Sequence, residues 1–171
     1  MNRFTRTCLF AALLAAFAGC GGSEAAKDEG GSAATAAIPD AFWLEKAPQG
    51  AVEVGAARAD AVDGAEITVH GKISTFVDGR AAFNLVDLAM LDCTQRPGDT
   101  CKTPWDYCCH SSEELAANTI TIEFRGPEGL LRRSAEGFHG IGHLSKVAIR
   151  GKARRDASGN LLVVAEVIGP E

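Results

Sequence analysis

From about Val52 onward, apolar and polar residues alternate in short runs that are separated by turn-forming residues. The clearest run covers residues 119–124, with the sequence Thr-Ile-Thr-Ile-Glu-Phe. Successive side chains of a strand point to opposite faces, so a period of two indicates strands with one buried face. This pattern predicts an all-β fold class.

The alternation predicts five strands, which cover residues 66–73, 81–91, 119–124, 146–152 and 161–168. Asp78-Gly79 joins the first two strands as a hairpin, because these residue types accept the positive φ that a tight turn needs. The sequence from Asp156 to Asn160 joins the last two strands in the same way. Between the hairpins we expect a short helix over residues 113–117 and a less regular segment over residues 129–144.

Two of the predicted strands carry a glycine within the run, in Gly71-Lys72 and Gly151-Lys152. A glycine inside a strand allows a sheet to bend sharply enough to close on itself. With this strand order and these bends, residues 52–171 resemble the OB-fold. The resemblance implies a small five-stranded, OB-like Greek-key barrel with short helical connections, and a small β-sandwich is the competing fold. We expect the domain to span residues 38–171, with Ile38 to Pro48 packing onto it.

The N-terminus has the layout of a secretory signal peptide, with Arg3 and Arg6 before an apolar run from Cys8 to Ala18. At about 1.5 Å per residue this run is too short for a bilayer core of about 30 Å. Residues 17–20, Phe-Ala-Gly-Cys, resemble the bacterial lipobox, although that family usually has leucine where Phe17 stands.

The lipobox resemblance implies a signal peptide over residues 1–19 and acyl chains of the palmitate type on Cys20. The protein would then be a lipoprotein anchored to a membrane of the bacterial cell envelope, on its periplasmic or extracytoplasmic face. The alternative is ordinary signal cleavage near Ala18. Residues 21–37 offer little to bury, so we expect a flexible linker after the lipidated cysteine, over residues 20–37 in all.

Nucleic acid is an improbable partner, because the formal net charge is −5. Lys and Arg outnumber acidic residues between Thr119 and Arg155, however. This basic half either faces an anionic partner or forms a solvated surface, and we favour the solvated surface.

An insertion between the second and third predicted strands contains four cysteines, Cys93, Cys101, Cys108 and Cys109. In an oxidising compartment four such residues usually form two disulfides. Adjacent cysteines are poor partners for each other because of ring strain. The expected pairings are therefore either 93 with 108 and 101 with 109, or 93 with 109 and 101 with 108. A closed loop of about 15 residues would add about 3 kcal/mol of stability.

Residues 101–109, Cys-Lys-Thr-Pro-Trp-Asp-Tyr-Cys-Cys, resemble the Cys-x-Thr-Pro-Trp-Asp-Tyr-Cys-Cys motif of a group of uncharacterised bacterial exported lipoproteins. The resemblance implies the same location and an OB-fold-like domain. It implies no activity, because none is assigned to that group.

The alternative interpretation of the insertion is a metal-binding or thiol-redox site, because thiolates and imidazole ligate zinc and copper. Its residues would be Cys93, Cys101, Cys108, Cys109 and His110. The spacing lacks a Cys-x-x-Cys pair, and adjacent cysteines rarely supply two ligands to one centre. We therefore favour disulfides and expect no cofactor and no metal.

His139 and His143 have the spacing of a zinc-binding helix, but three glycines in this segment favour a turn-rich connection. The sequence contains no Gly-x-Ser-x-Gly elbow and no phosphate-binding loop. We accordingly predict that the protein is not an enzyme.

The favoured function is a non-enzymatic binding or interaction module that uses its open sheet face or the stapled loop. An exposed aromatic pair and a basic strand suggest candidate binding residues: Trp105, Asp106, Tyr107, Arg150 and Lys152. The expected partners are the membrane, through the anchor, and an envelope glycan, peptide or protein.

Overall fold

The computed structural model describes residues 37–171. The predicted signal peptide, the lipidated Cys20 and the linker as far as residue 36 lie outside the described residues. The strands are β1 (Val52–Glu53), β2 (Glu66–Phe76), β3 (Ala82–Val86), β4 (Thr119–Glu123), β5 (Arg125–Gly126), β6 (Gly129–Leu130), β7 (Lys146–Arg155) and β8 (Leu161–Pro170). The helices are α1 (Val54–Asp60), α2 (Ser112–Ala117) and the 3-10 turns η1 (Asp40–Phe42), η2 (Cys93–Gln95) and η3 (Phe138–Gly140).

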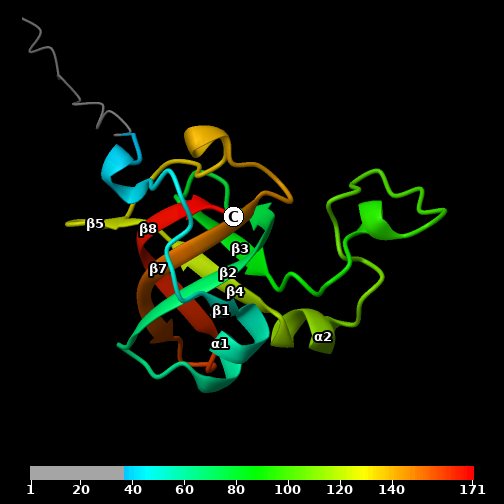
Figure 1. The fold of residues 1–171 in the computed structure, drawn as a ribbon, viewed down its shortest axis with the longest axis horizontal. Coiled ribbons are helices and arrows are strands. Elements are labelled where there is room, and N and C mark those ends of the chain that lie inside the picture. The colour runs from blue at the N-terminus through cyan, green and yellow to red at the C-terminus, as the bar shows by residue number, and fades with distance from the viewer. Residues whose placement is uncertain (1–36) are drawn as a thin grey trace, which may run out of the picture. The chain divides into compact units, whose positions relative to one another are not determined.

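Six strands form one mixed sheet in the order β1-β2-β3-β4-β8-β7, and β2 also pairs with β7. The pairings of β2, β3, β4, β8 and β7 therefore form a closed circuit, in which only β4 and β8 run parallel. Figure 1 shows these strands wrapped around one another. The all-β prediction is confirmed.

The predicted strand number of five is wrong for the described chain, because three further strands of two residues each are present. β1 adds to the main sheet as a parallel partner of β2, with Val52 opposite Val69. β5 and β6 form a separate small hairpin. Two residues are too few to leave an alternating pattern in the sequence, so these strands have no period-two signal.

Both predicted bend glycines stand where two backbones approach closely. A Cβ atom at Gly71 would lie 2.5 Å from the carbonyl oxygen of Val86, and one at Gly151 would overlap the carbonyl of Val164. Near Gly71, β2 exchanges β7 for β3 as its pairing partner. The ladder between β7 and β8 shifts register next to Gly151. Only a residue without a side chain fits these two positions.

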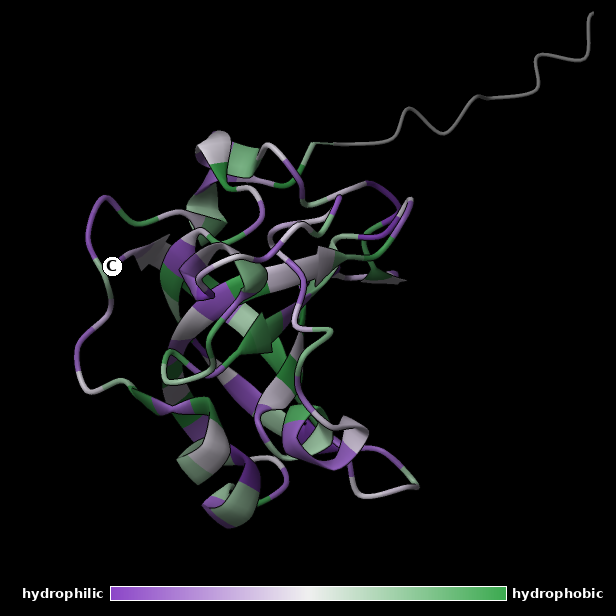
Figure 2. Cartoon of the chain, turned by 90° about the vertical axis from the view of Figure 1, so that its right-hand side faces the viewer, coloured by the Kyte–Doolittle hydropathy of each residue, from purple (hydrophilic) through white to green (hydrophobic). Residues whose placement is uncertain are grey.

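The core fills the space enclosed by the strands, because the inward positions of each strand are apolar. Hydrophobic and hydrophilic residues alternate along the strands in Figure 2, as the period-two pattern requires. The largest fully buried side chains include Phe83, Phe124, Ile73, Leu85, Ile120, Ile122, Ile149, Leu161 and Ile168.

The segment that precedes β1 packs onto this core, as the sequence predicts. Ile38 is buried, and the ring of Phe42 lies edge-on to Phe124 at a centroid distance of 5.3 Å. Trp43 forms a bridge to Ile168 of β8. The domain therefore includes these residues.

Two predicted elements differ in their bounds. The strand expected over residues 81–91 ends at Val86, because the side chain of Asp87 accepts hydrogen bonds from the amides of Gly55 and Ala89 and starts a turn. The predicted helix over residues 113–117 is confirmed as α2, which begins with a reciprocal capping box between Ser111 and Glu114.

Within residues 37–171, no helix is long and apolar enough to span a bilayer.

The segment between β3 and β4, residues 87–118, is called the insertion below. It carries η2, the four cysteines and α2, and in Figure 1 it projects from one side of the sheet. Val86 and Thr119 pair across the ladder of β3 and β4, so the two ends of the insertion leave the sheet side by side.

Candidate functional site

A buried lysine of β2 holds the start of the insertion against the sheet. Lys72 is only 4% exposed, and its Nζ donates to the carbonyl of Met90 at 2.7 Å. It also donates to Asp92 Oδ2 and Gln95 Oε1, each at 2.9 Å. The same ammonium lies 5.6 Å from the centroid of the Tyr107 ring, within the range of a cation–π contact.

Asp92 begins the short helix η2 and is the counter-ion of Lys72. One of its carboxylate oxygens accepts from the amide of Thr94, and Gln95 Oε1 accepts from the amide of Asp92. Burial alone would raise the pKa of Asp92, but hydrogen bonds from Thr94 and Lys72 outweigh it, and the pKa falls below its ordinary value. The carboxylate is therefore charged at neutral pH and stays paired with the lysine.

Backbone hydrogen bonds clasp the two halves of the insertion together. The amide of Cys93 donates to the carbonyl of Asp106, and the amide of Thr94 donates to the carbonyl of Pro104, both at 3.0 Å. Tyr107 follows this clasp and packs with Val86, Met90, Leu115 and Leu144 in a small second core.

Tyr107 is not exposed as the sequence suggested, because its side chain is only 3% exposed. Tyrosine suits both a surface and a core, and the sequence does not show that the insertion folds back over this ring. Burial raises the pKa of the Tyr107 hydroxyl, and the charge of Asp92 adds to the shift. The buried hydroxyl has no hydrogen-bond partner within the described part of the chain.

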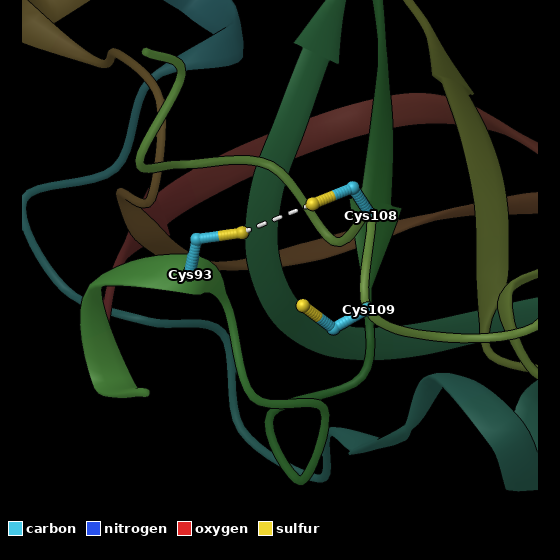
Figure 3. A group of neighbouring side chains, drawn as sticks. All are labelled: Cys93, Cys108 and Cys109. Atoms are coloured by element: carbon cyan, nitrogen blue, oxygen red, sulfur yellow. Dashed lines mark hydrogen bonds between the residues drawn. The ribbon is translucent and has the colours of Figure 1, made fainter. Parts of the chain in front are cut away.

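The four cysteines of the insertion gather at one place as free thiols, with Cys93 buried and Cys108 and Cys109 exposed. The Sγ atom of Cys108 lies 3.6 Å from that of Cys93 and 3.4 Å from that of Cys101. Figure 3 shows the thiols of Cys93, Cys108 and Cys109 converging from η2 and from the loop after Tyr107.

The predicted disulfide staple is not formed in this structure. Both sulfur separations at Cys108 exceed a disulfide bond of about 2.05 Å. The Sγ atom of Cys108 lies at nearly the same distance from the Sγ atoms of Cys93 and Cys101, so the arrangement selects neither of the two expected pairings. The closure of the insertion instead comes from Lys72 and the backbone clasp described above.

The thiols stabilise one another in their protonated form. Burial raises the pKa of Cys93 to about 11, and a hydrogen bond with Cys108 acts in the same direction. A hydrogen bond to the Asp99 carboxylate raises the pKa of Cys101, and a hydrogen bond with Cys108 raises that of Cys109.

His110 follows the two adjacent cysteines but its ring nitrogens point to other groups. Nε2 lies 3.0 Å from the carbonyl oxygen of Leu91 and 3.1 Å from Nη2 of Arg96. Nδ1 lies 3.7 Å from Glu114 of α2. Among the residues described, the groups with metal-binding geometry at this place contain cysteines and Asp99, and His110 belongs to neither of them.

His139 and His143 lie in a turn-rich segment, as predicted, and they have different neighbours. His139 adopts a positive φ of 46° and stacks on Trp43 at 4.6 Å. His143 stacks on Trp105 of the insertion at 4.8 Å with an angle of 22°, and its Nδ1 lies 2.5 Å from the carbonyl oxygen of Ser74. The structure therefore does not bring the two imidazoles to one zinc site.

The stack of Trp105 on His143 bridges the insertion and the sheet, and a groove of about 440 Å³ lies beside it. The floor of this groove consists of outward-facing residues of three neighbouring strands, among them Thr75 of β2, Asn84 of β3 and Thr119 of β4. One wall comes from the insertion: Thr103, Trp105, Asp106, Tyr107, Leu115 and Ala116.

The groove offers hydroxyl and amide groups and little charge. Ser74, Thr75, Thr103 and Thr119 contribute hydroxyls, and no lysine or arginine is among the residues that line it. Asn84 uses its Oδ1 to accept from the hydroxyl of Thr121.

The predicted binding residues separate into two places. Trp105, Asp106 and Tyr107 line the groove. Arg150 and Lys152 lie on β7, where they pair with Thr68 and Glu66 of β2, and they do not line it. The sequence did not indicate Thr75, Asn84 or His143 as groove residues. For Asn84 a signal existed, because it occupies a polar position of a predicted strand, whereas Thr75 lies beyond the predicted strand 66–73 and belongs to the longer β2 of the structure.

Comparison with known proteins adds little to this description. The chain matches no protein-family model, and no curated protein is significantly similar to it. Among 21 similar chains of solved structures is the OBody AM1L10 bound to hen egg-white lysozyme. It has 13% sequence identity and a TM-score of 0.38, and the match covers 72% of this chain and 95% of that chain. A similarity of this degree supports no statement about the function of the present groove.

Proposed function

We propose that the protein is an exported lipoprotein whose domain binds a neutral oligosaccharide of the cell envelope in the groove beside Trp105. The observation that carries this proposal is the placement of Trp105 over the sheet, where it stacks on His143 at 4.8 Å above a floor of polar strand residues. The proposed activity is binding without chemical conversion of the ligand.

The lining of the groove favours sugars among possible ligands. Oligosaccharides present many hydroxyl groups and an apolar ring face, which match hydroxyl and amide groups around an aromatic plane. Tyr107 adds a buried hydroxyl without a partner, and an unsatisfied buried polar group destabilises a protein by about 1–3 kcal/mol. A ligand hydroxyl that reaches this group would remove the penalty.

Nucleic acid and extended peptides fit the groove less well. Phosphate groups require Lys or Arg, and neither type lines the groove. A peptide that joins a sheet needs a strand edge with free backbone groups. β3 is paired on both sides, by β2 and by β4, so this central strand of the groove floor offers no such edge.

We also propose that the domain is an OB-like barrel. The support is the closed circuit of five strands, with antiparallel β2-β3-β4 and a parallel step from β4 to β8. OB-folds bind oligosaccharides and oligonucleotides on their strand 2 and strand 3 face, next to the loops. In the circuit β3 and β4 are the second and third strands, and the groove lies over the face that they share with β2.

The proposed location at a membrane of the cell envelope rests on residues 17–20 and on lipid attached to Cys20. A Cys20→Ala variant should lose its membrane association in cell fractionation and keep an uncleaved or differently cleaved leader. Equal membrane association of the variant and the unchanged protein would contradict the lipid anchor and would leave the groove proposal intact.

The binding proposal is tested by calorimetric titration of the purified mature protein with neutral fragments of envelope glycans. Trp105→Ala should weaken binding at least tenfold, because a central tryptophan commonly contributes about 2 kcal/mol to an interface. Lys152→Ala is the matched control, since Lys152 is exposed on β7 and away from the groove.

Three outcomes would contradict the proposal. One is the absence of binding to any neutral glycan at millimolar concentration. The second is a stronger effect of Lys152→Ala than of Trp105→Ala, which would move the site to the basic strand. The third is preferential binding of a peptide over every glycan tested.

A further inference from the structure

The insertion holds a second group of residues, separate from the groove, whose geometry suits a metal ion. The Sγ atoms of Cys93, Cys108 and Cys109 all lie within 4.8 Å of one another. A metal–sulfur bond is about 2.3 Å, so thiolates on a tetrahedral centre lie about 3.8 Å apart. The separation of 3.6 Å between Cys93 and Cys108 is close to this value.

We infer that Cys93, Cys108 and Cys109 form a three-thiolate site for a thiophilic d10 cation, Zn²⁺ or Cu⁺. This inference goes beyond the proposed sugar binding and does not depend on it. Each thiol that coordinates the cation releases one proton to the solvent, and no oxidation or reduction takes part.

The three thiols converge although the insertion lacks the Cys-x-x-Cys spacing that is common in metal sites. Sequence reasoning disfavoured two adjacent cysteines as ligands of one centre, yet the thiols of Cys108 and Cys109 both face Cys93 (Figure 3). Cys93 belongs to η2 in the first half of the insertion, and the backbone clasp joins this half to the second half, which carries Cys108 and Cys109.

Both sides of the site are fixed before any ion binds. Cys93 follows Asp92, which is held by Lys72, and its own amide donates to Asp106. Cys108 and Cys109 follow Tyr107, which is anchored in the second core. Ligands on fixed backbone lose little conformational freedom on binding, which favours affinity. The exposed positions of Cys108 and Cys109 give an ion access from solvent.

A second group, Cys93, Asp99 and Cys101, overlaps the first through Cys93. We prefer the three-thiolate group because soft cations such as Cu⁺ and Zn²⁺ favour sulfur over carboxylate oxygen. In addition, Asp99 is already occupied, since its carboxylate accepts from the amide of Cys101 at 2.6 Å. Cys101 lies 3.4 Å from Cys108 but forms no ligand group with Cys109, so it serves as the matched control cysteine.

The test is anaerobic titration of the reduced, full-length mature protein with Zn²⁺ against a chromophoric chelator and with Cu⁺ against a colorimetric Cu⁺ chelator. We expect one tightly bound equivalent of one of these ions. Titration with Co²⁺ should show the intense thiolate-to-cobalt charge-transfer absorption that only sulfur ligands produce.

Cys108→Ser and Cys109→Ser should each lower the affinity by more than about 100-fold, because loss of outer-shell partners alone lowers it 10- to 100-fold. Both residues are exposed, so circular dichroism should show an unchanged fold. Cys101→Ser should retain the affinity within about threefold.

An equal loss in Cys101→Ser would overturn the assignment of the three ligands. Protein isolated from the envelope without reductant that carries two disulfides and no metal would overturn the site itself. Either failure is distinct from failure of the sugar proposal, because Trp105→Ala leaves all four thiols in place and the cysteine variants leave Trp105 in place.

Discussion

Replacing Lys72 by methionine tests whether a single buried cation fastens the insertion to the sheet. Methionine keeps the unbranched shape of the side chain but removes its charge and its three hydrogen bonds. The carboxylate of Asp92, which is 3% exposed, then loses its counter-ion. Removal of one partner from a buried ion pair destabilises proteins by about 3–5 kcal/mol.

We expect the free energy of unfolding to fall by about 3 kcal/mol, the lower end of this range, because Thr94 still donates to Asp92. A second substitution, Asp92→Asn, removes the unpaired charge. The double variant should therefore recover more than half of the loss. In the single variant, acidification that protonates Asp92 should also recover stability, because the uncompensated charge disappears.

The measurement is urea-induced unfolding followed by tryptophan fluorescence at neutral pH, with Lys152→Met as the control for loss of one positive charge. Lys152 is exposed, so its replacement should change the free energy of unfolding by no more than about 0.5 kcal/mol. A loss of less than about 1 kcal/mol in the free energy of unfolding of Lys72→Met would refute the reasoning, because a broken buried ion pair should destabilise the protein by about 3 kcal/mol. A double variant as unstable as the single variant would refute it as well.

Three further changes have defined outcomes. Burial lowers the pKa of His70, but hydrogen bonds and charges of Glu171 and Glu53 outweigh it and raise the pKa above 6.5. The contribution of His70 to thermal stability should therefore be fully present just below pH 6.5 and be lost as pH rises through the raised pKa, and His70→Gln should remove this part of the pH dependence. Gly71→Ala should lower the free energy of unfolding in urea by about 1–3 kcal/mol, because its Cβ would press on a backbone carbonyl of the neighbouring strand; an unchanged value would contradict the close approach. Tyr107→Phe should raise the melting temperature, because it removes an unsatisfied hydroxyl, and should weaken sugar binding in calorimetry; a clear loss of stability would show that the hydroxyl has a partner.

The long strands were predictable because each has one buried face. In β2, β4, β7 and β8 the period-two pattern extends over most of the strand, and the predicted ranges agree with the structure within a few residues. The helix α1 had no comparable signal. It is short, it contains Gly55, which disfavours helix, and it is held by a hydrogen bond from the Gly55 amide to Asp87 in a distant segment.

The site was only partly predictable, because its parts depend on how the insertion folds back. Trp105 and Asp106 stood out as polar and aromatic residues in a loop. Lys72 alternates with apolar residues along β2, which is typical of a solvent-facing position, but the insertion covers that face and buries the ammonium. His143 comes from a segment far along the chain, and only tertiary packing brings it to Trp105.

The ladder pair of Val86 and Thr119 fixes both ends of the insertion next to each other. The entropic penalty for closing such a loop grows only with the logarithm of its length, at about 0.6 kcal/mol for each doubling. None of the strand pairings that complete the circuit passes through residues 87–118. A designer could therefore exchange this segment for another of different length and sequence, provided that the graft again supplies partners for Lys72 and for the amide of Gly55, and the graft would acquire new recognition.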